Sequence, residues 1–272
     1  MSAALNLLTR RIRQFLALAS ITMQEVIVYK AQAYIWLFTD VLTALVMPFV
    51  WLSAEGTEFG GYPISQLILY YVVLVMVSSF VTSHFMWEIG TEIREGIFST
   101  HLLRPVSYAK FAIARNLGYR LVRTVLVLPF LVLLIAIFSR YVDYGDLYLG
   151  WGAWASLIMG HLVSVMLVLA MSMIALFTEE AETIFELYYF PMFFLSGQIV
   201  PVSLFPDWVQ TIAQVLPFYY TTAAPTEVLV GRHDSGAIIN ILLGQAVWIC
   251  ISYLVYLVLQ KAGRKHYTGV GM

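Results

Sequence analysis

Three long stretches without a single Asp, Glu, Lys or Arg dominate the sequence, and they limit what the chain can fold into. They cover residues 59–87, 147–178 and 235–260. Each is longer than the roughly 20 residues that a helix needs to cross the hydrocarbon core of a bilayer. The sequence therefore predicts an all-α integral membrane protein.

Six membrane spans are predicted, within a single transmembrane domain that takes in residues 1–272. The three uncharged stretches hold the second, fourth and sixth spans. The first span contains Asp40, the third has Arg120 and Arg123 at its base, and the fifth is interrupted by proline. The predicted spans are 33–54, 66–88, 119–139, 153–177, 184–200 and 236–260.

The composition agrees with this fold class and excludes others. Hydrophobic residues make up 61% of the 272 and charged residues only 11%, with a net charge of −1. No case for binding nucleic acid follows from that balance. The lone Cys250 lies in an apolar run, so no disulfide or cysteine metal site forms within one chain, and no metal site is predicted.

An amphipathic helix is predicted over residues 12–27, before the first span. Its apolar residues recur on one helical face, whereas Arg13, Gln14 and Gln24 lie away from that face. The N-terminal segment, 1–31, is therefore expected to lie in the membrane interface. Its mixed polarity is not that of a cleavable signal, so it is expected to stay in the mature protein.

Orientation follows from the lysine and arginine residues beside the spans, because cytoplasmic loops carry an excess of them. Of the 15, all but Arg140 and Arg232 lie before the first span, between the second span and the start of the third, or after the sixth. Both termini, including the tail of residues 261–272, are therefore predicted to be cytoplasmic.

The stretch of residues 190–217 begins as a fifth span would but is broken by proline and glycine. Each proline removes a backbone donor and restricts the residue before it, and a simple hairpin in lipid has no use for that. Apolar spacing between the last two prolines predicts a short amphipathic helix that turns back toward the membrane. At the outer face this stretch forms either a gate or a static plug. The candidate gate residues are Gly197, Pro201, Pro206, Trp208 and Pro217.

The longest cytoplasmic segment, residues 88–115, contains a predicted short helix over 97–104, between Gly96 and Pro105. Exposed apolar residues rimmed by charge suggest a surface for a partner. The alternative is that they pack under the chain's own membrane helices. The residues in question are Ile97, Phe98, Leu102 and Leu103.

Two motifs in these loops resemble those of the permease subunits of type-2 ABC exporters. The first, over residues 92–107, reads Glu-Ile-Arg-x-Gly-x5-Leu-Leu-Arg-Pro-Val-Ser. The second, over residues 195–208, reads Leu-Ser-Gly-x3-Pro-x4-Pro-x-Trp, and Leu-Pro-Phe follows it at 216–218. The resemblance covers essentially the whole chain and is greatest to poorly characterised paired permeases. It implies a place in the bacterial plasma membrane.

The resemblance also implies roles. The 1–31 segment would be an elbow helix, residues 97–106 the coupling helix that docks on a nucleotide-binding subunit, and the outer stretch two short re-entrant helices before the sixth span. The residues implied in coupling are Glu92, Arg94, Gly96, Ile97, Phe98, Leu102, Leu103, Arg104 and Pro105.

No Gly-x4-Gly-Lys-Ser/Thr phosphate loop occurs in the sequence, in agreement with permeases that carry no ATPase of their own. The chain itself is therefore expected not to be an enzyme. ATP and Mg would be bound by a separate subunit, present in two copies. A second permease chain, identical or diverged, would complete the assembly in membrane lipid.

Four residues are candidates for the transport path. Asp40 and His161 are polar side chains within predicted spans, and such residues are functional candidates by default. The alternatives are an ion pair for Asp40 and an interhelical hydrogen bond for His161. Tyr189 and Phe193, in the fifth span, either touch the substrate or lie at a lipid interface. A charge cluster that fixes the cytoplasmic loop is expected to include His84, Glu88, Glu92, Arg94 and Arg120.

Together these features predict the membrane subunit of an ATP-driven exporter of a lipid-like, drug-like or glycolipid substrate. An ion-coupled secondary transporter or channel that uses Asp40 and His161 is the alternative. Such transporters have inverted repeats and helix breaks near the bilayer midplane, which this sequence does not predict. An intramembrane protease would need His-Glu-x-x-His, or an arginine where Ile184 stands.

Overall fold

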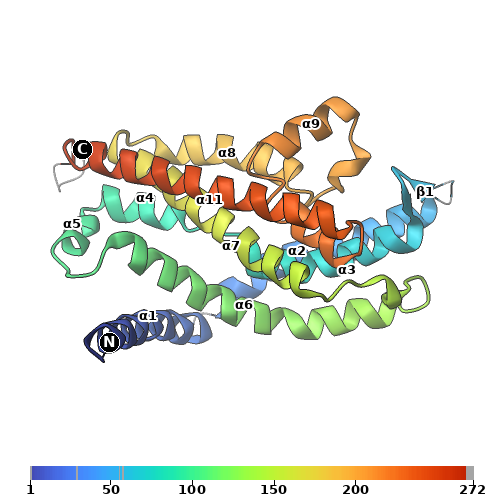
Figure 1. Cartoon of the computed structure of the whole chain (residues 1–272), viewed down its shortest axis with the longest axis horizontal. Helices are drawn as coiled ribbons and strands as arrows, with labels where there is room; N and C mark the ends of the chain where they lie inside the picture. The colour runs from blue at the N-terminus through green and yellow to red at the C-terminus, as the bar shows by residue number, and fades with distance from the viewer. Residues whose placement is uncertain (1, 29, 55, 57, 268–272) are drawn as a thin grey trace.

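A computed structural model describes residues 2–28, 30–54, 56 and 58–267. At residues 2–8, 10, 11, 30–33, 36, 37, 39 and 40 it describes the backbone alone. The described chain is helical apart from one small hairpin (Figure 1). The longer helices are α1 (Ser2–Val28), α2 (Lys30–Ser53), α3 (Ile64–Val81), α6 (Tyr108–Phe138), α7 (Trp151–Ser172), α8 (Ala181–Leu195) and α11 (Ser235–Gly263).

Short elements gather at the two ends of the molecule. One end carries α4 (Met86–Arg94), α5 (Ile97–Leu102), the 3-10 turn η2 (Met173–Leu176) and the end of α11, and it is called the α5 end below (Figure 1). The opposite end is called the α9 end. Its short elements are β1 (Glu58–Phe59), β2 (Tyr62–Pro63), η1 (Tyr144–Asp146), η3 (Val202–Leu204), α9 (Asp207–Val215) and α10 (Ala223–Leu229). β1 and β2 pair antiparallel, with Phe59 opposite Tyr62.

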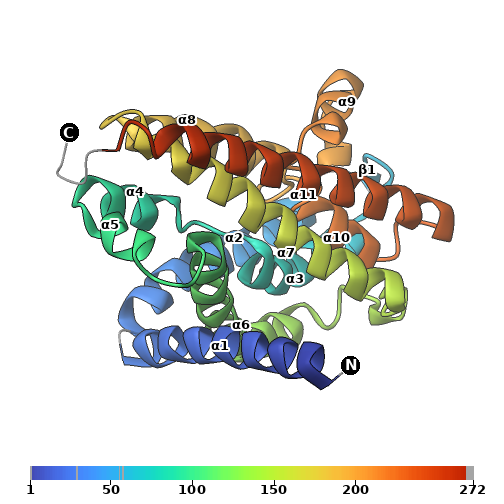
Figure 2. The same ribbon diagram turned by 60° about the vertical axis from the view of Figure 1, so that its left-hand side comes forward.

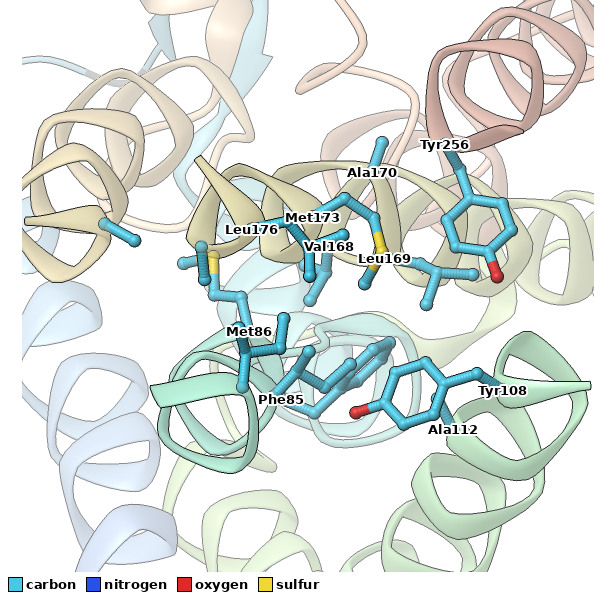
Figure 3. Packing of buried hydrophobic residues seen from close by; sticks show 14 of the residues in the cluster. Phe85, Met86, Tyr108, Ala112, Val168, Leu169, Ala170, Met173, Leu176 and Tyr256 are labelled. Atoms are coloured by element: carbon cyan, nitrogen blue, oxygen red, sulfur yellow. The ribbon is translucent and has the colours of Figure 1, made fainter. Parts of the chain in front are cut away.

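The helix α7 lies at the centre of the bundle and packs along α11, as both views show (Figures 1 and 2). At the α5 end, a buried core joins α4, the start of α6, α7 and α11. Figure 3 shows Phe85 and Met86 facing Leu169 of α7 and Met173 of η2, with Tyr256 of α11 beside them. Helices that are hydrophobic on most sides need this kind of internal burial.

The helix α1 lies across α6, as Figure 2 shows, and the crossing is very close. A Cβ atom added at Gly118 would lie 2.3 Å from the carbonyl oxygen of Ala19. Only glycine lets two helix backbones approach so near. A helix covers the predicted range 12–27 within α1: it packs on α6 through Ala19 and Thr22, which are buried, whereas the apolar Ile12 and Leu16 are exposed.

Among the described residues, four helical segments are long and apolar enough to cross a membrane. They are Ile64–Arg94, Tyr108–Phe138, Trp151–Leu176 and Ser235–Gly263, and they overlap the second, third, fourth and sixth predicted spans. The first predicted span falls on α2, which has 24 residues. The fifth falls on α8, whose 15 residues reach only about 22 Å and end before residue 200.

One prediction is wrong: the second span, 66–88, is not one continuous helix, because α3 ends at Val81 and α4 begins at Met86. The helix of the third span begins at Tyr108, before the predicted span, where the Ser107 side chain caps it by accepting a hydrogen bond from the Lys110 backbone N–H. The first 11 residues of α6 are thus a polar extension of the span.

Candidate functional site

The loop that carries the first motif forms a tight turn and a short helix. Gly96 has φ +77°, a conformation that glycine adopts without strain, and α5 begins directly after it. The helix ends at Leu102, two residues before the predicted end at Arg104. Pro105 accounts for this, because a proline disfavours helical geometry at the residue before it.

The apolar residues of α5 divide into two groups. Leu103 is 89% exposed, and Ile97 and Leu102 are also exposed, as predicted. The expectation that Phe98 is exposed is wrong, because its side chain is fully buried. Its ring lies 4.8 Å from that of Tyr108 and 5.4 Å from that of Tyr267, measured between centroids. Tyr267 is distant in sequence, so the local pattern did not reveal this pocket.

Glu92 holds this loop to α6. It accepts a hydrogen bond of 2.6 Å from the Tyr108 hydroxyl and pairs with the Arg115 guanidinium. Arg115 also lies 3.2 Å from Glu88, so Glu88 and Glu92 of the expected charge cluster share this arginine, whereas Arg94 pairs with Glu182 instead. His101, at the end of α5, is buried, and this burial lowers its pKa despite the nearby Glu92.

Arg94 and Arg104 lie at the two edges of the loop. The Arg94 guanidinium lies 2.8 Å from the Glu182 carboxylate in the first turn of α8. The Arg104 guanidinium lies over the Phe111 ring, 5.9 Å from its centroid. The loop therefore contacts both α6 and α8.

The break between α3 and α4 is held by side chains from α6 and α7. The Ser83 backbone N–H donates to Ser164 Oγ at 2.9 Å, and the Ser83 hydroxyl lies 3.2 Å from Asn116 Oδ1. His161 Nδ1 lies 3.3 Å from the Val81 carbonyl oxygen. Non-helical backbone at membrane depth is tolerated where protein or a cavity surrounds it. His161 thus lies in an interhelical hydrogen bond.

A cavity of about 780 Å³ opens beside this break. It is lined by residues of α1, α2, α3, α4, α6 and α8. Tyr189 and Phe193, two of the predicted path residues, line it, whereas His161 is not among its lining residues. The backbone of Asp40 is in α2, but its side chain lies outside the described residues.

Several lining residues were not predicted as path residues. They include His84, Trp87, Asn116, Tyr119, Arg120 and Arg123. The available signal was the run of Ser, Thr and His at residues 78–84 inside an otherwise apolar stretch, which marks a weak point in a helix. The sequence places Arg120 and Arg123 at the base of the third span, but nothing in it predicts that they line the same cavity as residues of α8.

At the α9 end, the stretch after α8 is held by hydrogen bonds to its backbone. Gly197 has φ +73°, and its carbonyl oxygen accepts a 2.9 Å bond from the Tyr70 hydroxyl. Tyr71 donates in the same way to the carbonyl oxygen of Ile199. Thr222 donates to the Ser196 carbonyl oxygen at 2.6 Å.

The prolines of this stretch lie at element boundaries, as their chemistry requires. Pro201 precedes η3, and Pro206 precedes α9. The helix predicted between Pro206 and Pro217 is confirmed as α9, and Trp208 on it is 68% exposed. The helix α10 follows and is entirely buried, so the two short helices are present between α8 and α11.

Inside α10, Glu227 is buried with two partners. It accepts a 2.7 Å hydrogen bond from the Tyr219 hydroxyl, and its Oε2 lies 3.1 Å from His233 Nε2. A buried carboxylate with such partners is a structural clamp on the turn between α9 and α11. Glu227 therefore ties this end of the molecule together.

A model of the family described as "ABC-2 family transporter protein" matches residues 13–271. The chain belongs to the ABC-2 transporter family. The match covers both motif loops, α1 from residue 13 onward and every helix of the bundle. No curated protein matches the chain.

Membership of the ABC-2 family identifies the chain as the multi-pass membrane subunit of an ABC transporter. The apolar helices of the fold agree with this assignment. Subunits of this kind work with a separate ABC ATPase and are not themselves catalytic.

Proposed function

We propose that this ABC-2 subunit is the permease of an ATP-driven exporter, with the α5 end in the cytoplasm and six crossings. The distribution of lysine and arginine supports this orientation, because all but Arg140 and Arg232 belong to the α5 side. The six crossings take α2 and α8 as spans, with α1 as the elbow helix in the inner interface. The membrane is the bacterial plasma membrane.

The observation that carries the proposal is the physical connection between the exposed end of α5 and the cavity. Glu92 beside α5 pairs with Arg115, and Arg115 lines the cavity. Arg94 pairs with Glu182 at the start of α8, and that helix carries two aromatic residues of the cavity wall. A displacement of α5 would therefore reach two walls of the cavity.

The docking surface would consist of Ile97, Leu102 and Leu103, together with Arg104. Exposed apolar side chains rimmed by charge fit a pocket on an ATPase subunit. Two such subunits would bind ATP and Mg, and their closure would press on α5. This is a two-state transition, in which ATP binds one arrangement more tightly than the other.

The outer gate would be formed by the stretch from Gly197 to Pro217. The hydrogen bonds from Tyr70 and Tyr71 of α3 to the carbonyl oxygens of Gly197 and Ile199 support this proposal, because they attach the start of the stretch to a span. A second permease chain would complete the exit path. The alternative of ion coupling through His161 is less well supported, because that imidazole already hydrogen-bonds the Val81 carbonyl oxygen at the break between α3 and α4.

The test is assembly with an ATPase. The chain would be co-purified with candidate ATPase subunits, and vanadate-sensitive ATP turnover would be measured for the native chain, Leu103→Asp and Leu102→Asp. Leu149→Asp is the matched control, because Leu149 is also an exposed leucine: its side chain is 59% exposed, and it lies near the start of α7, away from α5.

The expected result is that both α5 variants lose the ATPase while the control keeps it. If no ATPase associates with the native chain, or if the α5 variants assemble and turn over ATP as the control does, the coupling assignment is wrong.

A further inference from the structure

The turn that follows α11, residues 264–267, returns to the loop that carries α5. The end of α11 lies at the α5 end of the molecule (Figure 1). The backbone N–H groups of His266 and Tyr267 both donate to the Gly263 carbonyl oxygen, at 2.9 and 3.1 Å. Backbone hydrogen bonds therefore fix Tyr267 to the end of α11.

The end of α11 is itself closely packed. Gly263 is buried, and a Cβ atom added there would lie 2.5 Å from the Leu176 Cβ atom in η2. This approach leaves no room for a side chain at residue 263. The helix α11 also packs along α7, the central helix of the bundle. The turn therefore starts from a firmly held part of the fold.

From this turn the Tyr267 side chain reaches α5. Its ring meets that of Phe98 edge-on, with 5.4 Å between the centroids and 83° between the planes. Its hydroxyl oxygen accepts a 3.2 Å hydrogen bond from the Ser99 hydroxyl. Edge-to-face aromatic pairs at such separations are attractive beyond their buried area. One side chain at the end of α11 thus contacts two adjacent residues of α5.

The other contacts of α5 are with α6. The Tyr108 ring lies 4.8 Å from that of Phe98, and the His101 ring lies 4.5 Å from that of Phe111, measured between centroids. Removal of the Tyr267 side chain would leave these contacts in place. It would take away both the second ring beside Phe98 and the hydrogen bond to Ser99.

The conformation of α5 depends on such contacts. The helix has only six residues, and isolated helices shorter than about 12 residues are marginal in water. Its apolar residues Ile97, Leu102 and Leu103 are exposed and do not hold it to the chain. The side chains that turn inward therefore decide how firmly the exposed ones are presented.

We propose that Tyr267 is a positioning residue for the docking of α5. By its contacts with Phe98 and Ser99 it keeps α5 folded with Leu102 and Leu103 facing outward, so that the ATPase subunit meets a preformed surface. As an effect on docking, this inference rests on the function proposed above; as an effect on the order of α5, it does not.

The size of the effect follows from populations. If α5 has its docking arrangement for only a fraction of the time, the apparent dissociation constant rises by the inverse of that fraction. A population of about one in ten without Tyr267 would lower the affinity for the ATPase subunit roughly tenfold.

The first measurement is hydrogen exchange of the full chain in detergent, without any ATPase. The variants are Tyr267→Ala, which removes both contacts, and Tyr267→Phe, which keeps the ring and loses the hydrogen bond. His266→Ala is the matched control, because His266 is exposed, adjacent in sequence, and has its ring 5.9 Å from that of Phe177.

The α5 backbone amides should exchange roughly tenfold faster in Tyr267→Ala, less so in Tyr267→Phe, and as in the native chain in His266→Ala. The amides of α7 should keep their native rates in all three variants. That comparison separates a local release of α5 from a general loss of stability.

The second measurement is titration of the ATPase subunit. Affinity should fall roughly tenfold for Tyr267→Ala and recover most of its native value in Tyr267→Phe. At a saturating concentration of the permease chain, ATP turnover should equal that of the native complex, because the docked arrangement is the same. A chain that had lost its fold would not give this split between affinity and turnover.

The inference is overturned if the α5 amides of Tyr267→Ala exchange at the native rate, if α7 loses protection as much as α5 does, or if His266→Ala acts like Tyr267→Ala. Native affinity of Tyr267→Ala for the ATPase would overturn it as well. If no ATPase binds even the native chain, the proposed function fails instead, and the exchange rates still decide whether Tyr267 orders α5.

Discussion

Shortening Phe98 and shortening Leu103 to alanine should separate the packing of α5 from its docking. Phe98 is fully buried between Tyr108 and Tyr267, whereas Leu103, five residues later, is 89% exposed. Truncation of a buried phenylalanine costs about 3–5 kcal/mol, because apolar contacts are lost and a cavity remains. Truncation of an exposed leucine changes the stability of the free chain by no more than about 0.5 kcal/mol.

Two measurements on the purified chain distinguish these effects. Unfolding monitored in a fixed detergent gives the loss of stability, which should be large for Phe98→Ala and near zero for Leu103→Ala. The affinity for the ATPase subunit should fall roughly tenfold for Leu103→Ala, the effect of losing a central apolar contact. Phe98→Leu, which keeps an apolar side chain of similar length, should recover most of the stability.

The reasoning fails if the two variants behave alike. Equal loss of stability would mean that Leu103 is packed within the chain. Unchanged stability of Phe98→Ala would mean that the aromatic contacts with Tyr108 and Tyr267 do not hold α5 in place.

Three further perturbations test other parts of the fold. Gly118→Val should separate α1 from α6, because the new Cβ atom would lie 2.3 Å from the Ala19 carbonyl oxygen. The rate of hydrogen exchange of the α1 backbone amides should rise, and an unchanged rate would contradict the close crossing. Gly197→Ala should cost about 1–2 kcal/mol, because φ is +73° and a Cβ would lie 2.4 Å from the Tyr70 hydroxyl oxygen. In a Tyr70→Phe background, which lacks that oxygen, Gly197→Ala should cost less than in the native chain, and purely additive costs would argue against the clash. Burial lowers the pKa of His101 below its ordinary 6.5, so the folded chain favours the neutral imidazole. Protection of the α5 backbone amides from hydrogen exchange should therefore be full above about pH 6.5 and should fall as the pH drops below it. His101→Asn should remove this pH dependence.

Local chemistry was enough to predict the elements that prolines and caps delimit. The helix α9 begins after Pro206 and ends before Pro217, as expected from the loss of backbone donors. The long uncharged stretches likewise gave the positions of α7 and α11. These features depend on residues that are neighbours in the sequence.

The helix break and the cavity depend on residues far apart in the sequence. An uncharged run continues through residues 81–87, and the break exists because His161, Ser164 and Asn116 replace the missing helical hydrogen bonds. The burial of Phe98 depends on Tyr267 in the same way. Tyr189 and Phe193, which were predicted as path residues, line the cavity, whereas nothing in the sequence placed Arg120 and Arg123 in the same lining.

The close contact of Gly118 with Ala19 fixes the distance between α6 and α1 at this level of the helix. If α6 tilts about this contact as a fulcrum, Tyr108, about 15 Å away on one side, and Pro129, about 16 Å away on the other, would move in opposite directions. Arg120 and Arg123 lie only about 3 and 8 Å from the fulcrum and would hardly move.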